Sequence, residues 1–505
     1  MGRAKLERVL GSADDIGAVL EGLLVEHGLR APFEPYQTPA SGIEGRVDLR
    51  DLVTFTIDPE TAKDFDDAVS IEWDAKYDSP RVWVHIADVS HFVPAGSPLD
   101  HGAARRAFST YVPGLVAPML PPELSEDLCS LRPHQGRLCV TVELPPDPDD
   151  EPLFYRSVIR SDARLTYGQA ERLEAEPKIR TALELLGPLA EGLRQLRFQR
   201  GALRIETPEI EFAFDGRGGV EQARKQSEPR AHMLVEELMI LANEAVAGLL
   251  AGRDREALYR VHERPDPQAV ALLLAKLADL KVPTPPAPDA QSLSPSEAER
   301  VAAAISEGVE GYVARSGRGR EAFPALVLRS LKQARYDSRN LGHSGLASPA
   351  YCHFTSPIRR YPDLVCHRAL LREIGTSDES APEDLAALAE HTSEREREAA
   401  QVEYLADEIC LAWLLDQELF ELGWEHVFEG EIIGLIGSGL FVRFGDVFEG
   451  YLPARRLPGD YFELNPLATA LVGRRGGGTF RLGDPIEVRV EKIERYEGKV
   501  ELSVA

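Results

Sequence analysis

The sequence predicts an α+β protein built from two or three domains. Strand patterns dominate residues 47–210, helix patterns dominate residues 232–422, and the tail after Trp424 carries strand patterns alone. A chain of 505 residues is too long for one ordinary domain, and its 43% hydrophobic content is ample for buried cores.

The first 45 residues predict a small helical unit followed by a linker. Apolar residues recur at helical spacing through residues 4–29, with a break at Gly11 and Ser12, so we expect about two helices. Three prolines at positions 32, 35 and 39 then indicate an extended linker. The unit suits a docking arm, and a helix-turn-helix-like RNA clamp is the alternative.

The strongest candidate for a functional site is residues 58–67, which lie between two predicted strands at 52–57 and 68–71. Ten residues here hold four aspartates: Asp58, Asp64, Asp66 and Asp67. Carboxylates this close repel one another, so they are costly without a cation. Oxygen ligands suit hard cations such as Mg²⁺ or Mn²⁺.

Two alternatives apply to this stretch. A solvated acidic loop would have the same composition. A calcium-binding EF-hand loop would need Gly at its sixth position and Glu at its twelfth. Counting from Asp58 places Lys63 and Val69 there, and counting from Asp64 places Val69 and Ala75, so the EF-hand is excluded.

The central elements follow from periodicity. Alternation predicts strands at 81–89, 139–144, 154–159, 201–212 and 259–263, and helical spacing predicts helices at 180–199, 232–250, 323–335, 363–373, 382–391 and 393–422. Residues 282–294 contain four prolines and predict a loop. We expect the pair Glu236 and Glu237 to be satisfied core carboxylates, and contact with the metal site is the alternative.

The tail predicts five short strands at 431–434, 439–444, 449–453, 485–490 and 499–502. Five strands with aromatic side chains suit an OB-type barrel. A barrel that begins at the end of a helix is expected to be separable from the rest of the chain.

Composition constrains partners and surroundings. The formal net charge of −26 is unfavourable for contacts with phosphate, although the distribution of charge matters more than its sum. The five cysteines form no CxxC pair, and we expect reduced thiols. Neither a signal peptide nor a membrane span is indicated, so we expect a cytoplasmic protein that does not contact the membrane.

The aspartate pattern and four further motifs resemble the ribonuclease II/ribonuclease R family of 3′→5′ exoribonucleases. The further motifs occur in the family's order at residues 84–91, 111–121, 127–131 and 353–361, and the similarity runs from Val47 to the C-terminus. The resemblance implies an RNB-type catalytic domain at 46–423 and an S1 RNA-binding domain at 424–505, after the helical unit at 1–45.

The resemblance implies catalytic roles for the residues that match the family's motifs. Asp58, Asp64 and Asp67 would ligate metal, and Asp66 would be a further ligand that is essential to the hydrolytic step. Arg359 would be catalytic, contacting the scissile phosphate. The cofactor would be Mg²⁺ or Mn²⁺, in a two-metal-ion mechanism.

The resemblance also implies residues that bind RNA. They are Tyr111 and Phe212 as aromatic contacts in the channel, Arg360 and Glu403 beside them, and Phe441, Arg443, Phe444 and Tyr451 on the S1 barrel, with Arg455 and Arg456 near phosphates. The family usually has Arg after this glutamate, whereas this chain has Tyr404.

We therefore expect a processive hydrolytic enzyme that degrades single-stranded RNA to nucleoside 5′-monophosphates. It would act as a monomer and need no nucleotide cofactor. The competing class is a non-catalytic RNA-binding protein with the same fold. Whether duplexes are degraded stays open, because the chain lacks both a lysine-rich tail and room for cold-shock domains.

Overall fold

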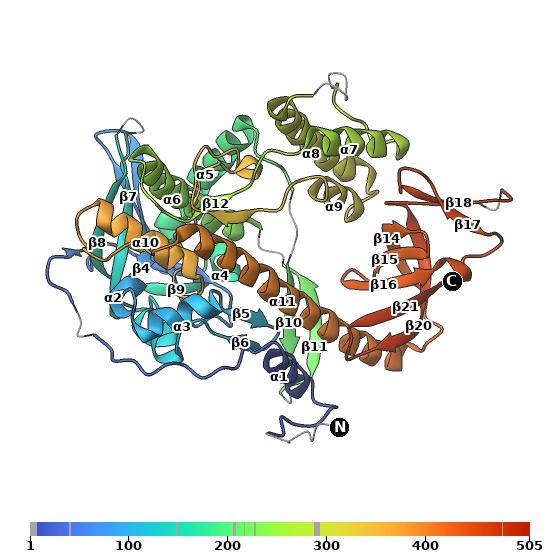
Figure 1. The fold of residues 1–505 in the computed structure, drawn as a ribbon, viewed down its shortest axis with the longest axis horizontal. Coiled ribbons are helices and arrows are strands. Elements are labelled where there is room, and N and C mark those ends of the chain that lie inside the picture. The colour runs from blue at the N-terminus through green and yellow to red at the C-terminus, as the bar shows by residue number, and fades with distance from the viewer. Residues whose placement is uncertain are drawn as a thin grey trace.

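The computed structural model describes residues 8–39, 42–147, 150–205, 209–216, 218–226, 229–286, 293–476 and 478–505. Residues 47–166 form a seven-stranded sheet, which we call the central sheet, in the order β1-β8-β7-β4-β3-β2-β9. It lies on the left in Figure 1, at the opposite end from the C-terminal strands. The strands of this sheet are β1 Val47–Asp48, β2 Phe55–Asp58, β3 Asp67–Asp74, β4 Ser79–Ala87, β7 Gly136–Leu144, β8 Leu153–Arg160 and β9 Ala163–Thr166.

Two long helices, α5 Pro177–Arg200 and α6 Pro229–Gly252, pack on this sheet. Leu186 of α5 and Leu238 of α6 are fully buried in one core with Phe55 and Val84 of the sheet. Alternation along the strands directs these apolar residues to one face, and helical spacing gives each helix a matching stripe. The mixed fold class predicted from the sequence is confirmed.

Shorter elements complete this half of the molecule. They are α2 Val89–Phe92, α3 Pro98–Arg106, β5 Thr110–Val112, β6 Leu115–Ala117, the π-helical η1 Glu123–Leu128, α4 Tyr167–Glu171, β10 Ile210–Phe214, β11 Val220–Lys225, β12 Tyr259–Val261, α7 Pro267–Asp279, α8 Pro295–Ser316, α9 Ala322–Leu328, β13 Arg335–Asp337, the 3-10 helix η2 Ser344–Leu346 and α10 Tyr361–Glu373. The sequence did not predict α7 or α8, and α9 is shorter than predicted. The predicted strand at 201–212 is strand only from Ile210 among its described residues.

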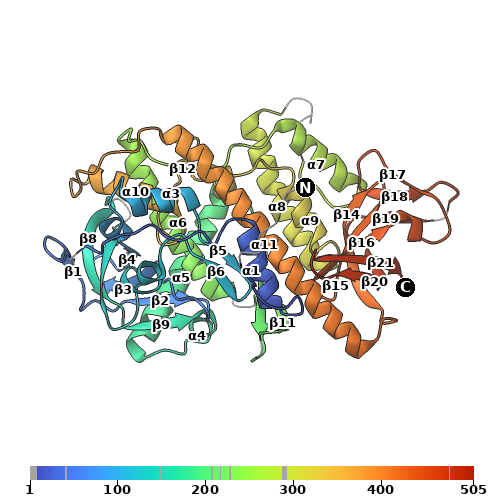
Figure 2. The ribbon, with the colours of Figure 1, turned by 60° about the horizontal axis from the view of Figure 1, so that its bottom comes forward.

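The two predicted helices at 382–391 and 393–422 are one helix, α11 Leu385–Leu422, of 38 residues. The expected break falls at Thr392 and Ser393. Their hydroxyls donate to the carbonyls of Leu388 (2.9 Å) and Ala389 (2.7 Å) one turn earlier, so the polar groups are satisfied without ending the helix. Figure 2 shows α11 running from the catalytic half to the barrel.

Only one helix, α1 Ile16–Glu26, occurs in the described part of the N-terminal unit. Asp15 caps it by accepting from the backbone N–H groups of Gly17 and Ala18, which sets its start. The expected first helix, where it is described from residue 8, is not helical. The described residues therefore form no helix-turn-helix, and α1 packs against α11 and β6 instead.

The C-terminal strands form the expected closed barrel in the order β14-β15-β16-β21-β20. They are β14 Phe428–Ile436, β15 Gly439–Phe444, β16 Phe448–Pro453, β20 Pro485–Glu494 and β21 Lys499–Val504, with η3 Ala454–Arg456 after β16. A second sheet, β17 Phe462–Leu464, β18 Ala470–Gly473 and β19 Thr479–Arg481, is inserted before β20.

The barrel is not separate from the rest of the chain. Leu415 and Leu419 of α11 share one buried cluster with Leu440 and Leu502 of the barrel, and α1 joins the same cluster. All five cysteines are free and buried. Among the described residues, no helix is both long enough and apolar enough to span a membrane.

Candidate active site

The four aspartates lie at one end of the central sheet because β2 ends at Asp58 and β3 begins at Asp67. Asp66 is 3% exposed, and burial raises its pKa well above the usual range. Burial, followed by the charge of Asp67, raises the pKa of Asp58 to about 7. Burial raises the pKa of Asp67 to about 6. The protein by itself therefore leaves these negative charges poorly compensated.

Arg359 is nearly 300 positions away in sequence, and the fold brings it to Asp66. The carboxylate of Asp66 accepts the backbone N–H of Ile358 at 2.8 Å through Oδ1. Its Oδ2 is 3.5 Å from Nε of Arg359 and, among the described residues, has no hydrogen-bond partner. The segment before α10 thus reaches Asp66 with both its backbone and a guanidinium.

Arg360 points elsewhere. Its guanidinium donates to Oδ1 of Asp363 in the first turn of α10 at 2.8 Å, and the same oxygen accepts the backbone N–H of Ser356 at 2.8 Å. These contacts fix the turn that carries Arg359.

Tyr111 lies in the hairpin of β5 and β6, which we call the Tyr111 hairpin. Its hydroxyl donates to Asp64 Oδ2, so the ring stands beside the aspartates. Its backbone N–H donates to Oε1 of Glu403 on α11 at 2.7 Å. Arg30, after α1, donates at 2.7 Å to the carbonyl of Val116, the cross-strand partner of Tyr111. Glu403 and Arg30 therefore hold the hairpin from both sides.

Phe212 lies on β10 and packs partly buried in the cluster of α11 and the barrel. Phe214, two residues on, reaches the Tyr111 hairpin: its ring lies 3.4 Å from the position that a Cβ on Gly114 would take. Gly114 has a φ of +76°, so both its backbone and the ring favour glycine.

An aromatic pair at the site was missed by the sequence analysis. Tyr167 and His232 stack with centroids 3.7 Å apart and planes at 17°. Burial, then the charges of Asp67 and Asp58, raises the pKa of Tyr167. The pairing of β9 with β2 places Thr166 opposite Asp58, so Tyr167 follows immediately after the strand partner of Asp58. Predicting this placement would have required the parallel register of β2 and β9, which the sequence does not reveal.

On the barrel, Phe441 and Tyr451 are cross-strand partners with ring centroids 5.4 Å apart, and both are half-buried. The prediction that Phe444 is a stacking platform is wrong. Its side chain is 1% exposed and packs inside the barrel against Phe428 and Phe448.

The basic residues predicted on the barrel are paired with carboxylates. Arg443 lies 3.2 Å from Glu449, and Arg455 and Arg456 lie 3.4 and 3.0 Å from Glu501. Contact with phosphate at these three arginines would have to compete with these pairs.

A family model described as the RNB domain matches residues 46–375, and one described as the S1 RNA binding domain matches residues 423–505. The chain belongs to the ribonuclease II/ribonuclease R family. Ribonuclease R of Escherichia coli (strain K12) is 36% identical over 545 residues, covering 99% of this chain and 64% of that protein. Ribonuclease R of Thermotoga maritima is 35% identical over 532 residues, covering 99% of this chain and 72% of that protein.

Solved structures of ribonuclease R also resemble this chain. Mycoplasma genitalium RNase R in complex with ribose methylated single-stranded RNA matches with a TM-score of 0.87 at 26% identity, covering 99% of this chain and 79% of that chain. The chain spans about 64% of the length of the E. coli relative.

The aspartates of this ribonuclease II/R-family chain fit a hard cation by their chemistry. They offer oxygen ligands only, Asp66 Oδ2 has no hydrogen-bond partner in the described structure, and mutual repulsion adds to burial at Asp58. Among the described residues, no three His, Cys, Asp or Glu side chains already converge on one point where a cation could sit. Binding of a cation would therefore require these carboxylates to turn toward a common point.

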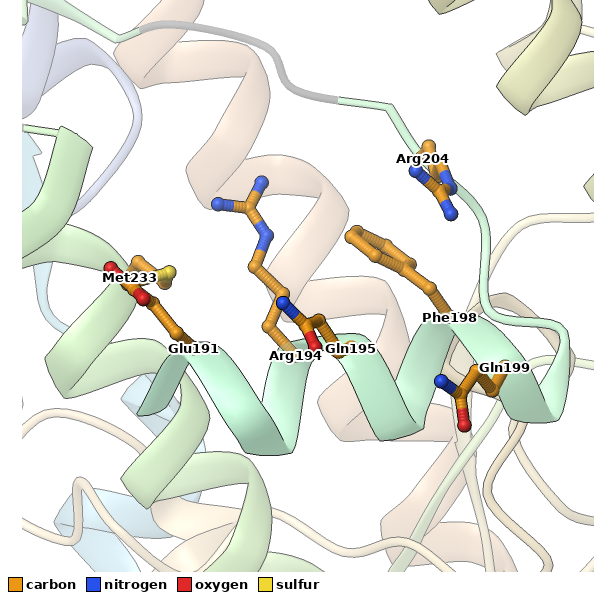
Figure 3. A pocket seen from close by; sticks show the side chains of 7 residues that line it. All are labelled: Glu191, Arg194, Gln195, Phe198, Gln199, Arg204 and Met233. Carbon is orange, nitrogen blue, oxygen red and sulfur yellow. The ribbon is translucent and has the colours of Figure 1, made fainter. Parts of the chain in front are cut away.

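A cavity of about 370 Å³ lies away from the aspartates, along α5 (Figure 3). Its central feature is Phe198, whose ring lies 4.5 Å from the guanidinium of Arg204. Arg204 also pairs with Glu307 of α8 at 3.2 Å, and the neighbouring Arg197 pairs with Glu237 of α6. These contacts join α5 to α6 and α8. Glu237 is satisfied in the core as the sequence predicts, but the prediction is wrong for Glu236, which also pairs with Arg197 at 3.3 Å and has a side chain that is 53% exposed.

Proposed function

We propose that this chain is a metal-dependent exoribonuclease. It would degrade single-stranded RNA processively from the 3′ end, by hydrolysis, and release nucleoside 5′-monophosphates. The observation that carries the proposal is the junction at Asp66, where a buried carboxylate meets the Ile358 N–H and the Arg359 guanidinium. Buried carboxylates also form structural ion pairs, as Glu237 does with Arg197, but Asp66 keeps one oxygen without a hydrogen-bond partner among the described residues and lies beside three further aspartates, which favours catalysis over RNA binding alone.

We assign Asp58, Asp64, Asp66 and Asp67 to the cation, which we infer to be Mg²⁺. When bound, divalent cations would relieve the charge on the phosphate oxygens and help to ionise the attacking water. Arg359 contributes a planar guanidinium that suits two oxygens of the scissile phosphate. Its exposed side, 47% of the side chain, is available to RNA while its Nε faces Asp66.

Tyr111 is assigned to stack on a base at the 3′ end, where its ring stands beside Asp64. Glu403 acts through the Tyr111 backbone, and Arg360 acts through the turn before α10. Phe212 is assigned to the same wall of the channel, and the pair of Phe441 and Tyr451 to RNA approaching over the barrel.

The partner is single-stranded RNA, and we propose a monomeric cytoplasmic protein that needs no nucleotide cofactor. The proposal draws support from the structures of M. genitalium RNase R in complex with ribose methylated single-stranded RNA and with double-stranded RNA. The catalytic unit would extend from residue 46 to Gly423, at the end of α11, and the S1 barrel would follow.

The test uses the full chain and a single-stranded RNA labelled along its whole length, so that released mononucleotides carry label, with Mg²⁺ and with a chelator. We expect mononucleotides from the first time points, no shortening in the chelator, and no shortening by the variant Asp66→Asn. A second substrate, a duplex with a 3′ overhang, reports whether digestion stops at the duplex. Binding of RNA without release of mononucleotides would favour the non-catalytic alternative.

A further inference from the structure

The sheet inserted between β16 and β20, which we call the insert sheet, has one face covered and one face open. Its strands are β17, β18 and β19, seen at the outer end of the barrel in Figures 1 and 2. Phe462, Leu471 and Phe480 share the covered face: Leu471 pairs with Phe480 across the strands, and the rings of Phe462 and Phe480 are 5.3 Å apart.

Alternation places the neighbouring residues on the opposite face. They are Tyr461, Val472, Arg474 and Arg481. The backbone N–H of Arg474 donates to the carbonyl of Tyr461 at 3.0 Å, which continues the ladder between β17 and β18 to these two residues. Tyr461 is 70% exposed, and Val472 is 42% exposed.

The exposed ring is supported from one side by a cation. The guanidinium of Arg474 lies 5.2 Å from the Tyr461 centroid, and Arg474 also pairs with Glu463. A ring held in this way keeps its orientation while its other parts stay open to solvent, which lowers the entropic cost of stacking another ring on it.

The insert sheet is less acidic than the chain as a whole. Residues 460–484 contain three arginines and three carboxylates, in a chain whose net charge is −26. Arg475 and Arg481 are exposed, and among the described residues neither guanidinium has a carboxylate partner. By contrast, Arg443, Arg455 and Arg456 on the barrel are paired.

We propose that the open face of the insert sheet is a second binding site for single-stranded RNA, separate from the pair of Phe441 and Tyr451. A base stacks on Tyr461, a phosphate near it contacts Arg475 in the turn after β18, and a phosphate farther along the RNA contacts Arg481 at the end of β19. An exposed aromatic and unpaired arginines on one small sheet provide what single-stranded nucleic acid needs, a stacking surface and positive charge. The proposal rests on the function proposed above, because it concerns the same substrate.

The site has a defined position relative to the catalytic half. Asn465 and Thr469, in the turn between β17 and β18, contact Asp279 at the end of α7. Arg318, after α8, pairs with Asp484 at 2.9 Å, next to the sheet. The insert sheet is therefore fixed to α7 and α8, and RNA bound there is held at a constant place on the molecule rather than on a free loop.

The test measures RNA affinity with the full-length variant Asp66→Asn as the parent, so that the RNA stays intact. Adding Tyr461→Ala should weaken binding of a long single strand about five-fold or more, which is the range for one lost stack. Adding Arg475→Gln and Arg481→Gln should lower the salt slope of binding by about 1.4, or about 0.7 for each lost phosphate contact.

The matched control removes two other exposed cations of the same barrel, Lys492 and Lys499, as Lys→Gln changes. Both lie at the turn of β20 and β21 and pair with glutamates, and we expect an unchanged salt slope. Melting temperatures equal to that of the parent verify folding of each variant.

Unchanged affinity and slope in both insert-sheet variants would overturn the proposal, and so would an equal loss in the lysine control. If the parent itself bound no RNA and the wild-type chain released no mononucleotides, the proposed function would fail first. If the parent bound RNA and both insert-sheet variants bound it with the same affinity and the same salt slope, the second site would be disproved and the proposed function would stand.

Discussion

Replacing Tyr111 separates stacking from hydrogen bonding at the 3′ end of the RNA. In Tyr111→Phe the ring stays and only the hydroxyl contact with Asp64 is lost. In Tyr111→Ala the ring is lost as well, while the backbone N–H still donates to Glu403 at 2.7 Å and Val116 still accepts from Arg30. Both variants should therefore keep the hairpin in place.

The expected effect follows from the energy of one stack. Base–aromatic stacking contributes roughly 1–3 kcal/mol, which corresponds to a dissociation constant about 5- to 150-fold weaker. For a long RNA the other contacts mask this loss. A short RNA near the end of digestion depends on this contact, so it should dissociate before cleavage, and the final undegraded fragment should become longer in Tyr111→Ala.

The assay digests a 5′-labelled single strand to completion and resolves the final fragment on a gel, alongside KM and kcat for a short RNA. We expect a longer fragment and a raised KM in Tyr111→Ala, with the fragment length of the wild-type chain in Tyr111→Phe. An unchanged fragment in Tyr111→Ala would refute the stacking role. The same lengthening in Tyr111→Phe would assign the effect to the contact with Asp64.

Three further predictions can be checked directly. Asp66→Asn should lower turnover by orders of magnitude and leave RNA affinity nearly unchanged in a filter-binding assay. Ending the chain at Gly423 should lower both RNA affinity and melting temperature, since it exposes the face of α11 that packs on the barrel. Burial, with the charge of Glu449, raises the pKa of Glu408 to about 7. The folded state therefore becomes less stable as pH rises from about 4.5 to 7 and Glu408 ionises. Glu408→Gln should raise the melting temperature at pH 8 but not at pH 4.

Local sequence was sufficient to predict the placement of residues that are close together in the chain. The four aspartates occupy ten positions between two strands, so any antiparallel pairing of β2 and β3 gathers them at one end of the sheet. The buried position of Phe444 could also have been predicted from the sequence. Leu440, Val442 and Phe444 alternate with Phe441 and Arg443, and in a closed barrel one set must face inward.

Other differences come from satisfied polar groups that the sequence does not reveal. The single helix α11 persists through Thr392 and Ser393 because both hydroxyls return to carbonyls of the preceding turn. The barrel looked separable because it begins at a helix end. It is not, because side chains of α11 and α1 complete its buried cluster.

The sequence by itself determined the fold class, the family, the aspartate cluster and the strands of the barrel, because each depends on spacing within a short segment. Tertiary structure alone decided which distant residues meet them. The approach of Ile358 and Arg359 to Asp66 and of Glu403 to Tyr111 depends on packing between elements hundreds of residues apart. The parallel register that brings Tyr167 to Asp58 likewise joins strands that lie far apart in the chain. The strands of the insert sheet follow one another in the chain, and only the packing of the fold decides which of its two faces stays exposed.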